Sequence, residues 1–227
     1  MRLKYVRVVI IENHDFIVQM YHSVLQALGS SFENWRFQIS EANDYENGLA
    51  LLNKLGQCGQ GIDLAILDLN ISISNRSSHY EGMEIGTKVR SRFEEAKIII
   101  MADYKNNYQI NSTLRYIKPE GFLIMTDLNS EILMPAVTEV LLDPPFYSKS
   151  VLKSLKKSNG HNFILDEWDE KLLYELSLGR KMKDLPDILP FSLATIEKRK
   201  KNIKSRFGIE GSDHNQLMEK AREYGFI

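Results

Sequence analysis

Five short apolar runs, separated by longer segments with helical patterns, constrain the fold of this chain most strongly. They are rich in Val, Ile and Leu and lie at residues 6–11, 37–40, 64–67, 97–101 and 121–125. Near-continuous runs of this kind are typical of strands that are buried on both faces of a parallel sheet. The intervening segments are long enough for right-handed crossover helices. The sequence therefore predicts a doubly wound, five-stranded parallel α/β domain over residues 1–142.

The pattern changes beyond this domain. Residues 143–162 contain a proline pair, several serines and four lysines without a sustained apolar period, which predicts a linker with a short helix near residues 148–155. After the linker, one helical pattern follows another. We therefore expect a small all-α domain over residues 163–227.

Composition narrows the class of protein. With 227 residues, 43% of them hydrophobic, and a net charge of -1, the chain can bury a sizeable core. No apolar run has the length of a membrane span or a signal-peptide core, so we expect a cytoplasmic protein without a membrane partner. The single cysteine, Cys58, cannot form an intrachain disulfide. The sequence shows no nucleophile elbow, Walker loop or metal-ligand spacing, so an enzyme is not expected.

Polar residues directly follow two of the predicted strands. Glu12 follows the first strand, with Asn13 beside it, and Asp68 follows the third, with Asn70 two residues later. In a doubly wound sheet, function gathers at the carboxyl ends of the strands. We therefore expect Glu12 and Asp68 to face each other in one acidic crevice.

The stretches IIENHD (10–15), DLAILDLNIS (63–72) and GFLIM (121–125) resemble the receiver domain of two-component response regulators, which has a flavodoxin-like fold. The resemblance implies that Asp68 accepts a phosphoryl group and that a sensor histidine kinase is a partner. It also implies a weak Mg²⁺ site, formed by Glu12, Asp68 and the backbone carbonyl of Asn70.

The chain departs from the receiver pattern at several positions. Asn13 replaces the usual second acid, which should lower metal affinity. Ala102 and Met125 stand where the family has a hydroxyl and a lysine, and neither side chain can donate a hydrogen bond. Phe122 stands at the switch aromatic and is interpreted as core packing. These departures favour an atypical receiver, regulated weakly or not at all by phosphate, in which Asp68 is either a phosphoacceptor or a carboxylate that is never phosphorylated.

Residues 165–209 resemble, without an internal gap, the helix-turn-helix domain of LuxR-type transcription regulators. The residues independently support a helix in this region. Ser192 is a suitable N-cap, and Ile196, Ile203 and Phe207 form one apolar stripe. Pro186 interrupts the preceding scaffold helix and should kink or shorten it.

The apolar stripe leaves a basic face that suits the major groove of DNA. The resemblance implies that Lys198 and Lys201 reach base edges, with Glu197 able to accept from a cytosine amino group. We predict that other cations contact phosphates in a salt-sensitive way. The predicted DNA-contacting residues are Lys183, Thr195, Glu197, Lys198, Arg199, Lys201 and Lys204. The resemblance also implies a homodimer on DNA through the last helix, whose apolar face is equally explained as core.

Two functions remain open at this point. The first is a response-regulator-like transcription factor that binds duplex DNA. The second is a protein-interaction adaptor with a pseudo-receiver and a helical domain that does not read DNA. A solvated helix face would also explain a basic run, but the gap-free helix-turn-helix pattern favours the DNA reader.

Overall fold

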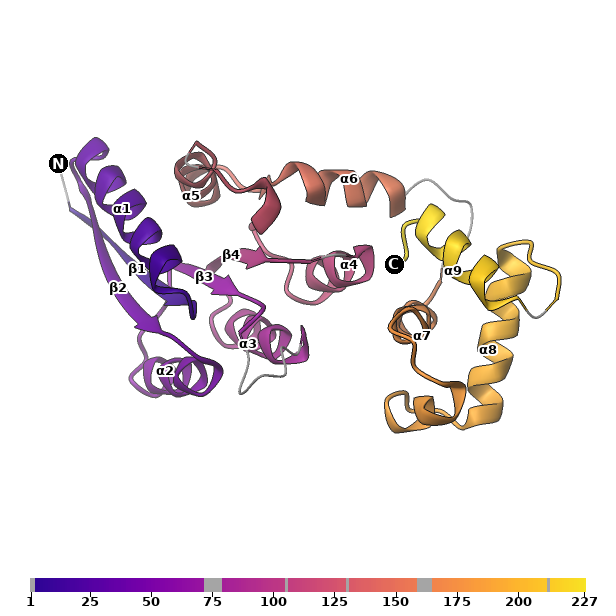
Figure 1. Cartoon of the computed structure of the whole chain (residues 1–227). Helices are drawn as coiled ribbons and strands as arrows, with labels where there is room; N and C mark the ends of the chain where they lie inside the picture. The colour runs from indigo at the N-terminus through magenta and orange to yellow at the C-terminus, as the bar shows by residue number, and fades with distance from the viewer. Residues whose placement is uncertain (1–2, 72–78, 105, 130, 159–164, 212) are drawn as a thin grey trace. The chain divides into compact units, whose positions relative to one another are not determined.

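The computed structural model describes residues 3–71, 79–104, 106–129, 131–158, 165–211 and 213–227. The chain divides into two compact units. We call residues 1–103 with 113–151 the sheet unit, and residues 104–112 with 152–227 the helical unit. Figure 1 shows the elements of each unit.

The sheet unit is built on one parallel sheet with the strand order β2-β1-β3-β4-β5-β6. The register is continuous across its centre, because Ile11 of β1 pairs with Leu67 of β3, and Leu67 pairs with Ile100 of β4. All five strands predicted from the apolar runs are present. Their bounds are β1 Lys4–Ile11, β2 Trp35–Ala42, β3 Leu64–Asp68, β4 Lys97–Ala102 and β5 Gly121–Ile124.

Helices cover both faces of this sheet, as the doubly wound prediction requires (Figure 1). On one face, Tyr21 and Leu25 of α1 and Val137 of α5 belong to a core cluster with alternate residues of the strands. On the other face, Gly48 of α2 lies against Ile11 and against Ile85 of α3. The bounds of the helices are α1 Asp15–Ser31, α2 Tyr45–Gln57, α3 His79–Arg92, α4 Asn107–Tyr116 and α5 Leu133–Leu142, with a short 3-10 helix η1 at Met125–Asp127.

The predicted count of five strands is wrong, because the sheet has a sixth strand. β6, Phe146–Tyr147, pairs in parallel with β5 through Gly121 and Phe122. A strand of two residues has no apolar periodicity of its own, and its order comes from pairing with β5. The segment interpreted as a linker thus supplies β6 and then α6, Lys149–Ser158, which corresponds to the short helix expected there.

Gly82 allows α3 to approach the end of β3 closely. A Cβ atom at this position would lie 2.2 Å from the backbone oxygen of Leu69. Because the obstructing atom belongs to the backbone, no side-chain movement could relieve the contact. Gly82 therefore fixes α3 directly beside the residues that follow Asp68.

The helical unit packs its elements around a separate apolar core. Leu172, Leu185, Ile196, Ile203 and Leu217 are each 0% exposed in this cluster. The element that contains Pro186 is a 3-10 helix rather than an α-helix, which confirms that proline shortens the scaffold helix. The bounds are α7 Glu167–Ser177, η2 Met182–Asp187, α8 Leu193–Arg206 and α9 His214–Glu223. Within the described residues, no helix combines the length and the apolar character needed to cross a membrane.

Candidate functional site

Two buried carboxylates meet at the carboxyl ends of the central strands. Glu12 follows β1 and is 2% exposed, and Asp68 is the last residue of β3 and is 6% exposed. They come together because Ile11 and Leu67 pair directly in the sheet, so the next residue of each strand lies at the same edge. The two carboxylates that the sequence analysis paired thus lie at the same edge of the sheet.

Local hydrogen bonds hold both carboxylates. Oδ1 of Asp68 accepts from the backbone N–H of Asn70 at 2.8 Å. Oε1 of Glu12 accepts from the backbone N–H of His14 at 2.9 Å and lies 2.8 Å from Nδ1 of the His14 ring. Each carboxylate is therefore bound by the residue two positions later, where the chain turns away from the strand.

Burial dominates the electrostatics of Asp68. The pKa of the Asp68 carboxyl is raised from 3.8 to about 6, mainly by burial and also by the negative charge of Glu12. The hydrogen bond from Asn70 and the nearby His14 act in the opposite direction. The fold thus buries Asp68 where its negative charge is unfavourable. The hydrogen bond from Asn70 and the nearby His14 offset only part of that effect.

The expected partners of a phosphoryl group are replaced by side chains without donors. Ala102 ends β4 and is 0% exposed, and Met125 is partly buried against the core cluster of α1 and α5. Phe122 is 0% exposed within β5, consistent with core packing. Asn13 is exposed. The two carboxylates therefore meet at one edge of the sheet, while Ala102 and Met125 offer no donor beside them.

The donor set of the acidic crevice fits Mg²⁺ poorly. Mg²⁺ prefers an octahedral shell of oxygen atoms, including several waters. Glu12 and Asp68 supply two carboxylates and the expected third oxygen is the backbone carbonyl of Asn70, but Asn13, which stands at the second acid, is neutral. The third side chain whose ligand atom lies within 4.8 Å of theirs is the imidazole of His14. A nitrogen ligand thus replaces the acid that a magnesium site would need.

Two residues of this site were not assigned to it from the sequence. His14 follows the first strand beside Glu12 but was not included among the predicted site residues, and Tyr21 was not singled out. Tyr21 is 1% exposed, and its hydroxyl has no hydrogen-bond partner among the described residues. Burial raises the pKa of Tyr21 well above its usual value, and the charges of Glu12 and Asp68 raise it further. The signal in the sequence was the position of His14, two residues after Glu12 at the end of the first strand.

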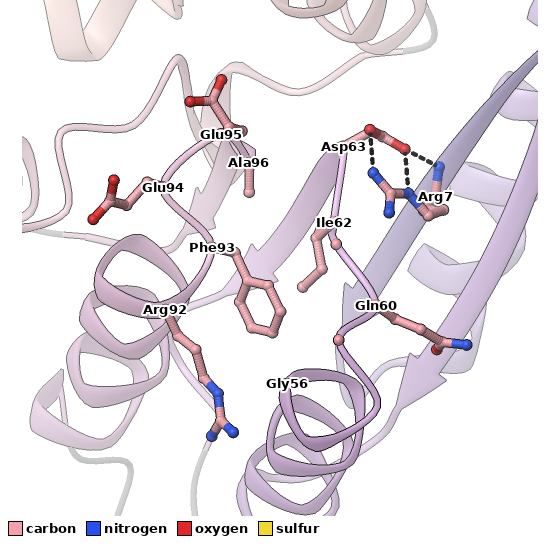
Figure 2. Close-up of a pocket in the computed structure, with 12 residues that line it drawn as sticks. Arg7, Gly56, Gln60, Ile62, Asp63, Arg92, Phe93, Glu94, Glu95 and Ala96 are labelled. Atoms are coloured by element: carbon pink, nitrogen blue, oxygen red, sulfur yellow. Dashed lines mark hydrogen bonds and ion pairs between the residues drawn. The ribbon is translucent and has the colours of Figure 1, made fainter.

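A second concave region lies at the opposite end of the sheet, beside the amino ends of β3 and β4. This pocket of about 380 Å³ has Phe93 and Ile62 pointing toward each other in it (Figure 2). Asp63 accepts from Nε of Arg7 at 2.8 Å and from Nη2 at 2.9 Å. The guanidinium of Arg92 extends toward Gly56 (Figure 2). The Arg7–Asp63 pair ties β1 to the start of β3 and gives this pocket a structural role.

In the helical unit, α8 has the cap and the buried stripe that the sequence predicts. The Ser192 side chain accepts from the backbone N–H of Thr195, which satisfies an orphan donor at the helix start. Ile196 and Ile203 are 0% exposed and Phe207 is 4% exposed. These contacts fix which side of α8 faces its own core.

The opposite side of α8 carries part of the predicted DNA-contacting set. Thr195, Glu197, Lys198 and Lys201 are exposed on it, and Lys183 of η2 is exposed as well. These four residues of α8 lie within the first nine residues after the N-cap, Ser192. They therefore form a short, mixed-charge patch at the amino half of the helix.

Arg199 and Lys204 are instead bound within the helical unit. Arg199 Nη1 lies 2.8 Å from Asp166 Oδ2 and 2.7 Å from Asp169 Oδ1, and its guanidinium lies over the Phe191 ring. Lys204 is 9% exposed and donates from Nζ to the carbonyl oxygen of Gly211 at 3.2 Å. The two cations fasten α8 to α7 and to the turn after α8.

The first turn of α7 is organised by the same acids. Asp166 is its N-cap and accepts from the backbone N–H groups of Trp168 and Asp169. The cap and the Arg199 pair lower the pKa of the Asp166 carboxyl against the opposing effect of burial. A single carboxylate thus both starts α7 and binds α8.

No protein-family model and no curated protein sequence matches this chain. Among solved structures, RcsB in a structure of two RcsB dimers bound to two parallel DNAs is similar, with 18% identity and a TM-score of 0.58, covering 97% of this chain and 99% of that one. The RcsB response regulator of Salmonella typhimurium has 19% identity and a TM-score of 0.55, covering 98% of this chain and 99% of its own. The isolated REC domain of RcsB from Salmonella enterica serovar Typhimurium, in the presence of phosphomimetic BeF3-, has 18% identity and a TM-score of 0.52, covering 66% of this chain and 98% of that one. Over nearly its whole length, the chain therefore has the fold of the RcsB response regulators.

Proposed function

We propose that this chain is a response-regulator-like transcription factor that binds duplex DNA. In this proposal residues 1–142 form a receiver-like domain, residues 143–162 a linker and residues 163–227 a LuxR-type helix-turn-helix domain. It is a binding protein rather than an enzyme. The likeness to RcsB, which is described in complex with DNA, supports the proposal at the level of the fold.

The observation that carries the proposal is the exposed patch on α8. Lys198 and Lys201 are three residues apart, so they lie on one side of the helix, and both are exposed. Ile196 and Ile203 hold the other side in the core at 0% exposure. A helix anchored in this way can insert its amino half into a major groove.

Each residue of the predicted set then has a distinct role. Lys198 and Lys201 contact base edges or phosphates of the DNA. Thr195 and Lys183 contact the DNA backbone, and Glu197 accepts a hydrogen bond from a cytosine amino group. Arg199 and Lys204 act as positioning residues, because their charged groups are bound to Asp166, Asp169 and Gly211. We further propose that two copies bind DNA as a homodimer, in keeping with the two-fold symmetry common in this class.

Phosphate control of this regulator is weak in our proposal. Asp68 is buried beside a second carboxylate, and neither Ala102 nor Met125 can donate to a phosphoryl oxygen. Intact mass after incubation with a small-molecule phosphodonor and Mg²⁺, with Asp68→Asn as the control, tests this point. A stable adduct that depends on Asp68 would overturn it and would justify a search for a sensor histidine kinase.

DNA binding is tested by the salt dependence of affinity for a mixed-sequence duplex. If about four cations contact phosphates, affinity should fall roughly a hundredfold between about 50 and 200 mM salt. The double variant Lys198→Glu, Lys201→Glu should abolish binding. A matched control, Lys153→Glu with Lys156→Glu, makes the same charge change on exposed positions of α6. This control should retain most of the affinity for DNA.

One observation favours the adaptor as the second candidate. Glu197 places a negative charge on the patch that would face phosphates. Binding that is insensitive both to salt and to the α8 double variant would refute the DNA reader and support an adaptor. Equal loss in the α6 control would show that net charge, rather than the α8 patch, determines binding.

A further inference from the structure

The third side chain of the acidic crevice changes what ion it suits. Glu12, His14 and Asp68 each offer one ligand atom, and these atoms all lie within 4.8 Å of one another. The two carboxylates are buried, whereas the His14 side chain is 66% exposed and approaches from the N-cap position of α1. The cluster therefore combines two buried carboxylates with an imidazole that reaches solvent.

Two carboxylates and one imidazole are ligand types that Zn²⁺ accepts. Zn²⁺ commonly takes three protein ligands from His, Asp and Glu and keeps a fourth position for water. Imidazole favours ions such as Zn²⁺ over Mg²⁺, and Mg²⁺ is bound mainly by oxygen. Tetrahedral bonds of the usual length place ligand atoms roughly 3.4 Å apart. Nδ1 of His14 lies 2.8 Å from Oε1 of Glu12, so two of the three ligand atoms are already adjacent.

A second feature near this cluster is the hydroxyl of Tyr21. It is buried and lacks a hydrogen-bond partner among the described residues, and buried hydroxyl groups are normally satisfied. Both Glu12 and Asp68 act on its pKa, so the phenol lies within electrostatic reach of the same two carboxylates. A water bound to an ion between them would accept the Tyr21 hydrogen bond.

We propose that Glu12, His14 and Asp68 hold a divalent ion of the zinc type in preference to Mg²⁺, with Tyr21 donating to a water on that ion. Such an ion would engage the oxygen of Asp68 that a phosphoryl group would otherwise need. Occupancy of the site would then depend on the concentration of the metal ion instead of on phosphorylation. This inference does not depend on DNA binding, and its tests use metal alone.

Titration of the full chain with Co²⁺, followed by visible absorption, provides the main readout. We expect ligand-field bands from a low-coordinate Co²⁺ site, which Zn²⁺ removes and a large excess of Mg²⁺ does not. His14→Ala should weaken Co²⁺ binding about tenfold or more, since even second-shell changes have effects of this size. His22→Ala is the matched control, because His22 lies on the same helix but pairs with Glu41.

Two further variants keep the proposal open to refutation. His14→Asp creates an all-oxygen set and should shift preference from Co²⁺ toward Mg²⁺. Tyr21→Phe should weaken Co²⁺ binding by a smaller factor than His14→Ala. If Mg²⁺ displaces Co²⁺ at similar concentration, or if His14→Ala with a native circular dichroism spectrum binds Co²⁺ as the parent does, the zinc-type site is wrong. Unchanged Co²⁺ affinity in Tyr21→Phe would show that Tyr21 takes no part in the metal site.

Discussion

Replacing Asp68 with asparagine should stabilise the sheet unit at neutral pH. The carboxyl is 6% exposed, and burial raises its pKa from 3.8 to about 6. Asparagine has nearly the same shape, carries no charge and retains an oxygen that can accept the hydrogen bond from the Asn70 backbone. The substitution therefore removes the cost of a buried charge with little loss of packing.

The magnitude and sign follow from the pKa shift. A shift of roughly two units corresponds to about 3 kcal/mol, because each unit is worth about 1.4 kcal/mol. Since the folded pKa is raised, the native state favours the neutral carboxyl. The stability associated with Asp68 is fully present below about pH 4 and is lost as the pH rises through about 6. Asp68→Asn should gain up to about 3 kcal/mol at about pH 7.5 and much less at about pH 4.5.

Asp63 provides a matched control with the opposite sign. The ion pair with Arg7 lowers the pKa of the Asp63 carboxyl, so its stability is present above the unfolded pKa and is lost as the pH falls through the folded value. Because both partners are more than a third exposed, solvent screening limits the effect. Asp63→Asn should lose about 1 kcal/mol or less at neutral pH.

Urea unfolding with a chelator present measures both variants. Each unit has one tryptophan, Trp35 and Trp168, so a Trp168→Phe background makes fluorescence report the sheet unit alone. Trp35 is 5% exposed and should respond to unfolding. If Asp68→Asn is less stable than its parent at neutral pH, or if its gain is the same at acid pH, the assignment of a costly buried charge is refuted.

Three further substitutions test the packing of each unit. Ile203→Ala, at a position 0% exposed, should lower the free energy of unfolding of the helical unit by about 2 to 4 kcal/mol, measured by Trp168 fluorescence; a loss below about 1 kcal/mol would contradict the buried stripe. Gly82→Ala should destabilise the sheet unit by about 1 to 3 kcal/mol, because its Cβ would meet the Leu69 oxygen at 2.2 Å; an unchanged melting temperature would contradict the close approach. Ser192→Ala should cost about 1 kcal/mol through the lost cap of α8, and equal stability in urea would show that the cap is dispensable.

Local patterns in the sequence were enough to predict much of the fold. Five of the six strands follow from apolar runs, because a strand buried on both faces must be apolar along its length. The Ser192 cap and the shortening at Pro186 were predicted correctly, since capping and the missing proline N–H act within one helical turn. The meeting of Glu12 and Asp68 also followed, because a parallel sheet brings its carboxyl ends to one edge.

The remaining features depend on contacts between distant residues. β6 has two residues and exists because β5 offers it a partner. Arg199 was predicted to face DNA, but Asp166 and Asp169, about thirty residues earlier in the chain, bind its guanidinium. Tyr21 packs against residues of β1 and β3 because α1 lies on that face of the sheet. The sequence by itself determined the strands, the caps and the acidic edge through local chemistry, and only the tertiary structure decided which charges face outward and which are bound, because those pairings join distant parts of the chain.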